Sequence, residues 1–146
     1  EANLQQTFFG CHLLNGTSNV GIVESEKTAL LCAILMPSIT WIATGGCNGC
    51  RWTEPNQAQI LKGKRVVLYP DAGMYQKWVE KSKSLSNVEV EISVSPICCN
   101  QPDNTDIADV LLLERQRSKV KPTTIGDVVQ WMKELGIEKG RITFNI

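Results

Sequence analysis

The sequence has no excess of charge of either sign. Fifteen Lys and Arg side chains balance fifteen Asp and Glu side chains, so the formal net charge is zero. A stand-alone nucleic-acid-binding domain is usually basic, because contacts to phosphate supply most of its non-specific affinity. The balance therefore argues against tight nucleic-acid binding by this chain alone. It does not exclude a catalytic part whose neighbours in a larger protein bind the nucleic acid.

Long apolar runs are also missing. No stretch approaches the length of about 20 residues that a membrane-spanning helix needs. The first residues, EANLQQTFFG, lack the basic start and apolar core of a secretory signal. The sequence does not begin with methionine. We therefore expect a piece of a larger, cytoplasmic protein with no membrane partner.

Histidine is scarce, although the sequence has six cysteines. His12 is the only histidine, and we expect it to be a packed or surface residue. Cys47 and Cys50 lie in a glycine-containing loop, and Cys98 and Cys99 are adjacent. Four thiolates would suit tetrahedral zinc, but adjacent cysteines are an awkward pair of ligands for one ion. We expect no zinc and reduced, partly buried thiols in a reducing compartment.

Strand-like and helix-like segments alternate along the chain. Strands are predicted at 20–23, 38–44, 65–69, 88–94 and 141–146, and helices at 3–14, 26–36, 56–61, 73–85 and 123–136, with 106–116 beginning as a loop and turning helical. This order implies β-α-β units and a mainly parallel sheet. We expect one α/β domain over residues 1–146, with a Rossmann-like sheet flanked by helices.

Acidic residues follow three of the predicted strands. Glu24 ends VGIV, Asp71 comes after RVVLY, and Asp106 and Asp109 follow VEVEISV after a loop. The carboxyl ends of parallel strands lie at one edge of the sheet, where ligands of open α/β sheets bind. Carboxylate oxygens suit Mg²⁺ or Mn²⁺. The sequence therefore predicts a metal site here, with solvated loop acids or helix caps as the alternative.

Two features near Glu24 point to a phosphate or a nucleotide. Lys27 lies in the first turn of the following helix, whose N-terminus favours anions, so it is a candidate catalytic residue that reaches a phosphate. The alternative is a solvated helix residue. Thr44, Gly45 and Gly46 form a loop that would let the backbone approach a nucleotide. The alternative there is an ordinary tight turn.

Four segments, in this order, resemble the motifs of the Toprim domain, which bacterial primases, type IA and type II topoisomerases and certain nucleases share. IVESEKTAL (22–30) resembles the first motif, an apolar strand ending in Glu. ATGG (43–46) resembles the glycine-bearing second motif, and KRVVLYPDAG (64–73) the third. DIADVLL (106–112) resembles the acidic stretch of the primase-like branch. The match covers about residues 20–113 and is most similar to primase-related proteins of mobile elements in Bacteroides-type bacteria.

The resemblance implies a Toprim-like domain of a DNA primase-related protein. Such a domain would transfer nucleotides on a DNA or RNA template with Mg²⁺ or Mn²⁺, alongside other replication proteins. Glu24 would be the general acid/base or a metal ligand, and Asp71 a metal ligand. Gly73 stands where the family has a second acid, so Asp106 or Asp109 would supply the missing oxygen, or the site would be inactive. The alternatives are a Toprim nuclease and a degenerate module that binds nucleic acid or a partner protein.

Overall fold

The computed structural model describes residues 6–46 and 49–119. Contacts within the chain group it into two compact units, residues 1–113 and 114–146. The fold below concerns the described part of the first unit and the helix Ile107–Lys119, which begins in that unit and ends past it. The prediction of one domain over the whole chain extends beyond the described residues and stays a prediction, as do the helix at 123–136 and the strand at 141–146.

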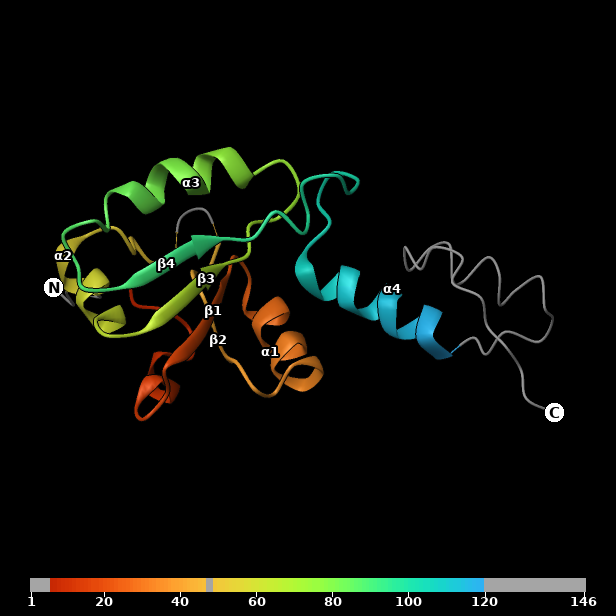
Figure 1. The fold of residues 1–146 in the computed structure, drawn as a ribbon, viewed down its shortest axis with the longest axis horizontal. Coiled ribbons are helices and arrows are strands. Elements are labelled where there is room, and N and C mark those ends of the chain that lie inside the picture. The colour runs from red at the N-terminus through yellow and green to blue at the C-terminus, as the bar shows by residue number, and fades with distance from the viewer. Residues whose placement is uncertain (1–5, 47–48, 120–146) are drawn as a thin grey trace, which may run out of the picture. The chain divides into compact units, whose positions relative to one another are not determined.

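The described residues contain one sheet of four parallel strands. These are β1 (Asn19–Val23), β2 (Thr40–Ala43), β3 (Arg65–Leu68) and β4 (Glu91–Val94), in the spatial order β2-β1-β3-β4 (Figure 1). Ile22 of β1 pairs with Ile42 on one side and with Leu68 on the other. Together with the flanking helices, this sheet confirms the predicted α/β class.

Helices cover both faces of the sheet (Figure 1). The described helices and turns are the 3-10 turn η1 (Cys11–Leu14), α1 (Glu26–Leu35), α2 (Pro55–Ala58), the 3-10 turn η2 (Gln59–Leu61), α3 (Tyr75–Lys83) and α4 (Ile107–Lys119). One core cluster contains Ala58, Leu61 and Trp78, from α2, η2 and α3. The other contains Cys32 of α1 and Ile107 of α4. In the described part of the chain, no helix is long and apolar enough to cross a membrane.

The start of α1 follows the prediction from sequence. Ser25 is the N-cap, and its Oγ accepts a hydrogen bond from the Thr28 backbone N–H at 3.1 Å. Such a cap satisfies one of the free N–H groups at a helix start. Glu24 is thereby placed between the end of β1 and the first turn of α1, at the rim of the sheet.

The helix predicted over residues 3–14 is wrong for the described residues 6–14. The backbone of Phe9 forms two hydrogen bonds with Ala43, of 2.9 and 3.1 Å, as an isolated antiparallel bridge. Gly10 has a φ of 79°, which ends any helix there, and only a 3-10 turn follows. Phe8 is buried in the core. Burial of Phe8 and pairing with β2 therefore override the helical spacing of the apolar residues.

Candidate functional site

The strand order reverses direction between β1 and β3. From β1 the chain passes through α1 to β2 on one side, whereas β3 lies against the other side of β1. In doubly wound sheets the carboxyl ends of two such strands border the ligand-binding crevice. Glu24 directly follows β1, and Asp71 comes three residues after the end of β3. The two predicted metal ligands thus lie at the switch point of the sheet.

The pKa of Asp71 reports how these acids are grouped. Burial, the negative charges of Glu24 and Asp106, and a smaller contribution from Asp109 together raise this pKa from 3.8 to about 6. The positive charge of Lys27 acts in the opposite direction. The structure therefore brings the four predicted carboxylates into one electrostatic neighbourhood. They do not share one environment, however.

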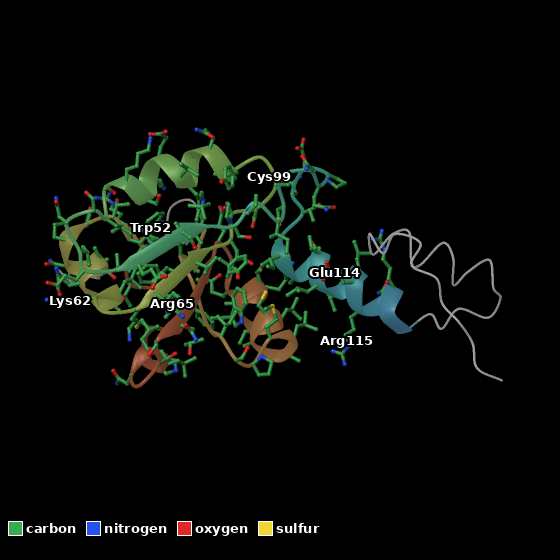
Figure 2. The ribbon with its side chains drawn as sticks, in the orientation of Figure 1. Trp52, Lys62, Arg65, Cys99, Glu114 and Arg115 are labelled. Carbon is green, nitrogen blue, oxygen red and sulfur yellow. The ribbon has the colours of Figure 1, made fainter. Side chains whose placement is uncertain are left out.

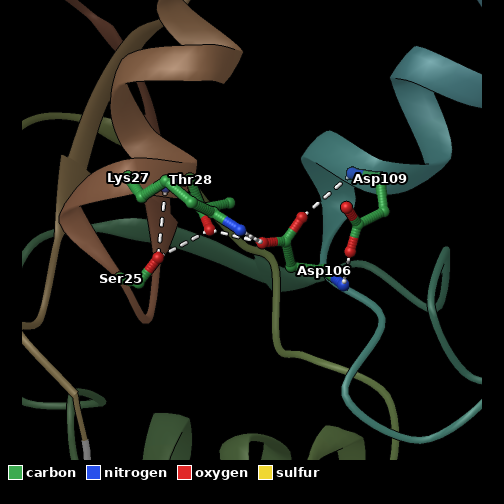
Figure 3. Close-up of polar contacts among 5 residues, drawn as sticks. All are labelled: Ser25, Lys27, Thr28, Asp106 and Asp109. Atoms are coloured by element: carbon green, nitrogen blue, oxygen red, sulfur yellow. Dashed lines mark hydrogen bonds and ion pairs between the residues drawn. The ribbon is translucent and has the colours of Figure 1, made fainter.

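Asp106 is held by a network of hydrogen bonds (Figure 3). Its side chain is only 9% exposed. The Oδ2 atom accepts a hydrogen bond of 2.6 Å from the Thr28 hydroxyl and lies 3.3 Å from Nζ of Lys27. The Oδ1 atom accepts a hydrogen bond of 3.0 Å from the Asp109 backbone N–H. Both oxygens of Asp106 are thus occupied by donors.

The same network fixes the direction of the hydroxyl hydrogen bonds. Ser25 Oγ and Thr28 Oγ1 lie 2.7 Å apart. Because the single hydroxyl proton of Thr28 is donated to Asp106, Ser25 must donate to Thr28. Asp109 completes a capping box, since its Oδ2 accepts from the Asp106 backbone N–H at 3.2 Å. The network links the first turn of α1 to the first turn of α4.

The pKa of Asp106 is lowered from 3.8 although burial alone would raise it. The hydrogen bonds from Thr28 and from the Asp109 N–H, together with the charge of Lys27, outweigh burial. Asp106 is therefore a stably ionised, fully hydrogen-bonded carboxylate. Lys27, predicted to reach a phosphate, is paired with it while its side chain remains 67% exposed.

Glu24 and Asp71 are in the opposite situation. Both are partly buried, and no hydrogen bond or ion pair reaches either carboxylate within residues 6–46 and 49–119. Magnesium in proteins commonly takes one or two carboxylates and completes its coordination with water and substrate phosphate. Two carboxylates without donors, in a negative environment, fit that requirement. Among the described residues no group of three His, Cys, Asp or Glu side chains is placed to hold a metal ion.

The glycine loop that follows β2 closes over the backbone of Glu24. The N–H groups of Gly45 and Gly46 both donate to the Glu24 carbonyl, each at 3.0 Å, and the Thr44 hydroxyl donates to it at 3.3 Å. Both glycines have φ near 80°, which favours glycine. The loop thus positions Glu24, and the two N–H groups that would have approached a nucleotide are already used.

Gly73 lies beside Asp71 in a conformation that favours glycine. Its φ is 81°, and a Cβ built there would meet no atom within 4 Å. The backbone of this chain is therefore adapted to glycine where the Toprim pattern carries a second acid. The space beside Gly73 is open.

The described cysteines that were considered as zinc ligands are separated. Cys50 belongs to the core cluster under α2 and α3, whereas Cys98 belongs to the cluster under α1. Burial raises the pKa of each thiol to about 11. Cys99, which is labelled in Figure 2, is exposed. Cys47 lies outside the described residues. Cys50 and Cys98 therefore lie in different core clusters and are not grouped with each other in the described residues.

Two lysines near Glu24 were not predicted. Lys77 and Lys81 of α3 line a small cavity together with Glu24 and Trp52. Their spacing of four residues places them on one side of the helix. That spacing is visible in the sequence, but it does not reveal which strand end the helix faces.

Comparison with known proteins gives one family similarity. Residues 1–72 are similar to DUF6371, a domain of unknown function. That match includes Glu24 and Asp71 and ends before Asp106. No curated protein and no solved structure matches the chain. The comparisons therefore assign no activity, and function is argued from the geometry.

Proposed function

We propose that the carboxyl edge of the sheet is a Mg²⁺- or Mn²⁺-dependent site for nucleotidyl transfer, in a Toprim-like domain of a DNA primase-related protein. The observation that carries this proposal is the pair Glu24 and Asp71. They lie at the switch point of the sheet, and no donor in the described residues satisfies them. The order of the four Toprim-like motifs supports the same assignment.

In this proposal Glu24 and Asp71 hold the cation. A divalent cation supplies charge neutralisation on the phosphate and orientation of the leaving group. The alternative role of Glu24, whose backbone carbonyl is fixed by Gly45 and Gly46, is to move a proton at the reacting group while Asp71 holds the cation. Asp106 acts as a positioning residue, because its hydrogen bond to Thr28 holds the start of α1 behind Glu24.

A catalytically inactive module that binds nucleic acid or a partner protein is the second candidate. Gly73 favours it, since only two donor-free acids remain where the Toprim pattern has three. The zero net charge also favours a part that depends on neighbouring domains. A nuclease would use the same acids, and only the reaction catalysed distinguishes it from a nucleotidyltransferase.

The activity should be measured in the natural protein that contains this chain. Primer synthesis from nucleotides on a single-stranded template, dependent on Mg²⁺, is the expected result. Glu24→Gln and Asp71→Asn should abolish it, while Asp103→Asn, at an exposed acid outside the site, should not. Metal-dependent cutting of the template without synthesis would assign the nuclease. Absence of both reactions, with template binding unchanged in the two variants, would favour the inactive module.

A further inference from the structure

A small cavity adjoins Glu24 on the side of the sheet that α3 covers. Its volume is about 30 Å³, and the residues that line it include Glu24, Trp52, Trp78, Lys77 and Lys81. Glu24 supplies a negative charge to the wall, and α3 supplies two positive charges. The cavity therefore places cations directly beside the proposed reaction site.

Lys77 and Lys81 differ from the other lysines in their partners. The other lysines with described side chains are all paired: Lys27 with Asp106, Lys62 with Glu89, Lys83 with Glu80, and Lys64 with the carbonyls of Leu14 and Thr17. In the described residues, neither Lys77 nor Lys81 has a carboxylate or carbonyl partner. Like charges four residues apart on a helix repel each other. An anion between them would relieve that repulsion.

The aromatic residues at this cavity favour recognition of phosphate over recognition of a base. Trp52, labelled in Figure 2, is only 3% exposed and packs against Trp78, with ring centroids 5.7 Å apart. Its ring is thus covered and cannot stack on an incoming base. Nζ of Lys81 lies 5.9 Å from the centroid of the same ring, which holds the ammonium group at the cavity.

We propose that Lys77 and Lys81 form a phosphate-binding site that positions a nucleotide or a nucleic-acid strand next to Glu24. The role of that phosphate as a substrate rests on the proposed function, whereas the binding itself does not. Lysine ammonium groups bind phosphate as point charges, so the site would be independent of base sequence. The phosphate belongs either to the backbone of a single strand or to a nucleoside triphosphate.

The test is binding in EDTA, which makes it independent of any metal. A fluorescein-labelled single-stranded DNA oligonucleotide is titrated with the chain, and its anisotropy is measured at several salt concentrations. The double variant Lys77→Ala/Lys81→Ala should bind about tenfold more weakly, which corresponds to about 1.4 kcal/mol. The slope of log K against log salt should fall by about 1.4, from two phosphate contacts at about 0.7 each.

The matched control removes the same charge elsewhere. Lys62→Ala/Lys83→Ala deletes two lysines that are paired with Glu89 and Glu80 and do not line the cavity. Figure 2 labels Lys62, which precedes β3 and so lies toward the opposite, amino edge of the sheet. This control should change affinity less than the cavity variant does. Equal losses in both double variants would overturn the proposal, because net charge alone would explain them.

Two further arms separate the phosphate sources and the underlying function. If the cavity variant loses ATP binding, measured by calorimetry in EDTA, but keeps oligonucleotide binding, the site holds a triphosphate. Lys77→Arg/Lys81→Arg should retain binding, and an unchanged melting temperature shows that each variant folds. Unchanged binding of both ligands by the cavity variant would overturn the proposal. Glu24→Gln should bind the oligonucleotide more tightly in EDTA while losing any metal response, so failure of the metal site is seen separately.

Discussion

Asp106 and Asp71 are carboxylates at the same edge of the sheet, yet they differ in their hydrogen-bond donors and in the direction of their pKa shifts. Asp106 is buried with donors on both oxygens, and its pKa is lowered. Asp71 is partly buried without a donor among the described residues, and burial and neighbouring charges raise its pKa to about 6. The ionised form of Asp106 stabilises the folded chain, whereas ionisation of Asp71 destabilises it.

The difference indicates which acids are available for a ligand. A buried, fully hydrogen-bonded charge is costly to disturb, because the donors around it would lose their partner. An acid without donors carries unsatisfied charge, and Asp71, whose pKa is raised, is of the kind that concentrates at functional sites. Of the four acids predicted as metal ligands, Glu24 and Asp71 are therefore the ones the structure leaves free, and Asp106 and Asp109 cap α4.

The largest expected effect on stability comes from replacing Asp106, the carboxylate whose oxygens both have donors. Asp106→Ala removes the N-cap of α4 and leaves the Thr28 hydroxyl without its acceptor, so it should lower the free energy of unfolding by about 2–4 kcal/mol. Asp106→Asn should cost less, since Asn caps helices as well as Asp does. The measurement is urea unfolding. Because the pKa of Asp106 is lowered, the advantage of the wild type over the alanine variant should shrink as pH falls below 4. A loss under about 0.5 kcal/mol at neutral pH would contradict the assigned network.

The next effect has the opposite sign. The folded pKa of Asp71 is raised, so its contribution to stability is present at low pH and is lost as pH rises through about 6. Asp71→Asn removes that ionisation and should stabilise the chain at pH 8 by about 1–2 kcal/mol, after allowance for solvent screening. Near pH 3.5 the two proteins should be equally stable. Destabilisation at pH 8 would mean that Asp71 has donors.

Gly73→Asp would add a third acid beside Glu24 and Asp71, the two carboxylates that lack donors in the described residues. At a φ of 81° an Asp costs about 1 kcal/mol in strain. Gly63→Asp is the matched control, because Gly63 has a φ of 73°, an equally open Cβ position and a place near the amino edge. Both variants should melt lower in EDTA. Only Gly73→Asp should gain a larger response to Mg²⁺, and an equal response in both would speak against a site beside Asp71.

The smallest expected effect on stability concerns the ion pair between Lys27 and Asp106. Lys27→Met keeps the aliphatic stem and removes the charge, so it should cost only about 0.5 kcal/mol, because the side chain is 67% exposed. The cost should decrease at high salt. Thermal unfolding at low and high ionic strength measures it. A cost near that of Asp106→Ala would show that Lys27, rather than the hydroxyl network, holds Asp106.

The sequence is sufficient to predict the α/β fold and the place of two of the four acids, Glu24 and Asp71. The runs VGIV and RVVLY predict buried parallel strands. Glu24 follows the first directly and Asp71 comes two residues after the second, so their place at one edge follows from strand direction. The state of Asp106 could not be predicted in this way. Its donor Thr28 lies 78 residues earlier, and only the packing of α4 beside α1 brings the two together.

The remaining differences are also long-range effects. Phe8 has helical spacing with its neighbours, but burial and the Phe9 bridge to Ala43 decide its conformation. In the sequence, Lys77 and Lys81 resemble solvated helix residues. Only the structure shows that they line the cavity and that the other lysines with described side chains are paired. Each case depends on contacts between segments that are distant in the sequence, which local patterns do not contain.

The most direct measurement of the central claim is the change in melting temperature that Mg²⁺ or Mn²⁺ causes in this chain. At ten times the dissociation constant, a cation that binds only the folded state would add about 1.4 kcal/mol of stability. We expect that gain in the wild type and in Asp103→Asn at pH 8, and its loss in Glu24→Gln and Asp71→Asn. An equal response to the cation in all four proteins, or none in any of them at saturating metal, would contradict the assignment of Glu24 and Asp71 as a metal site.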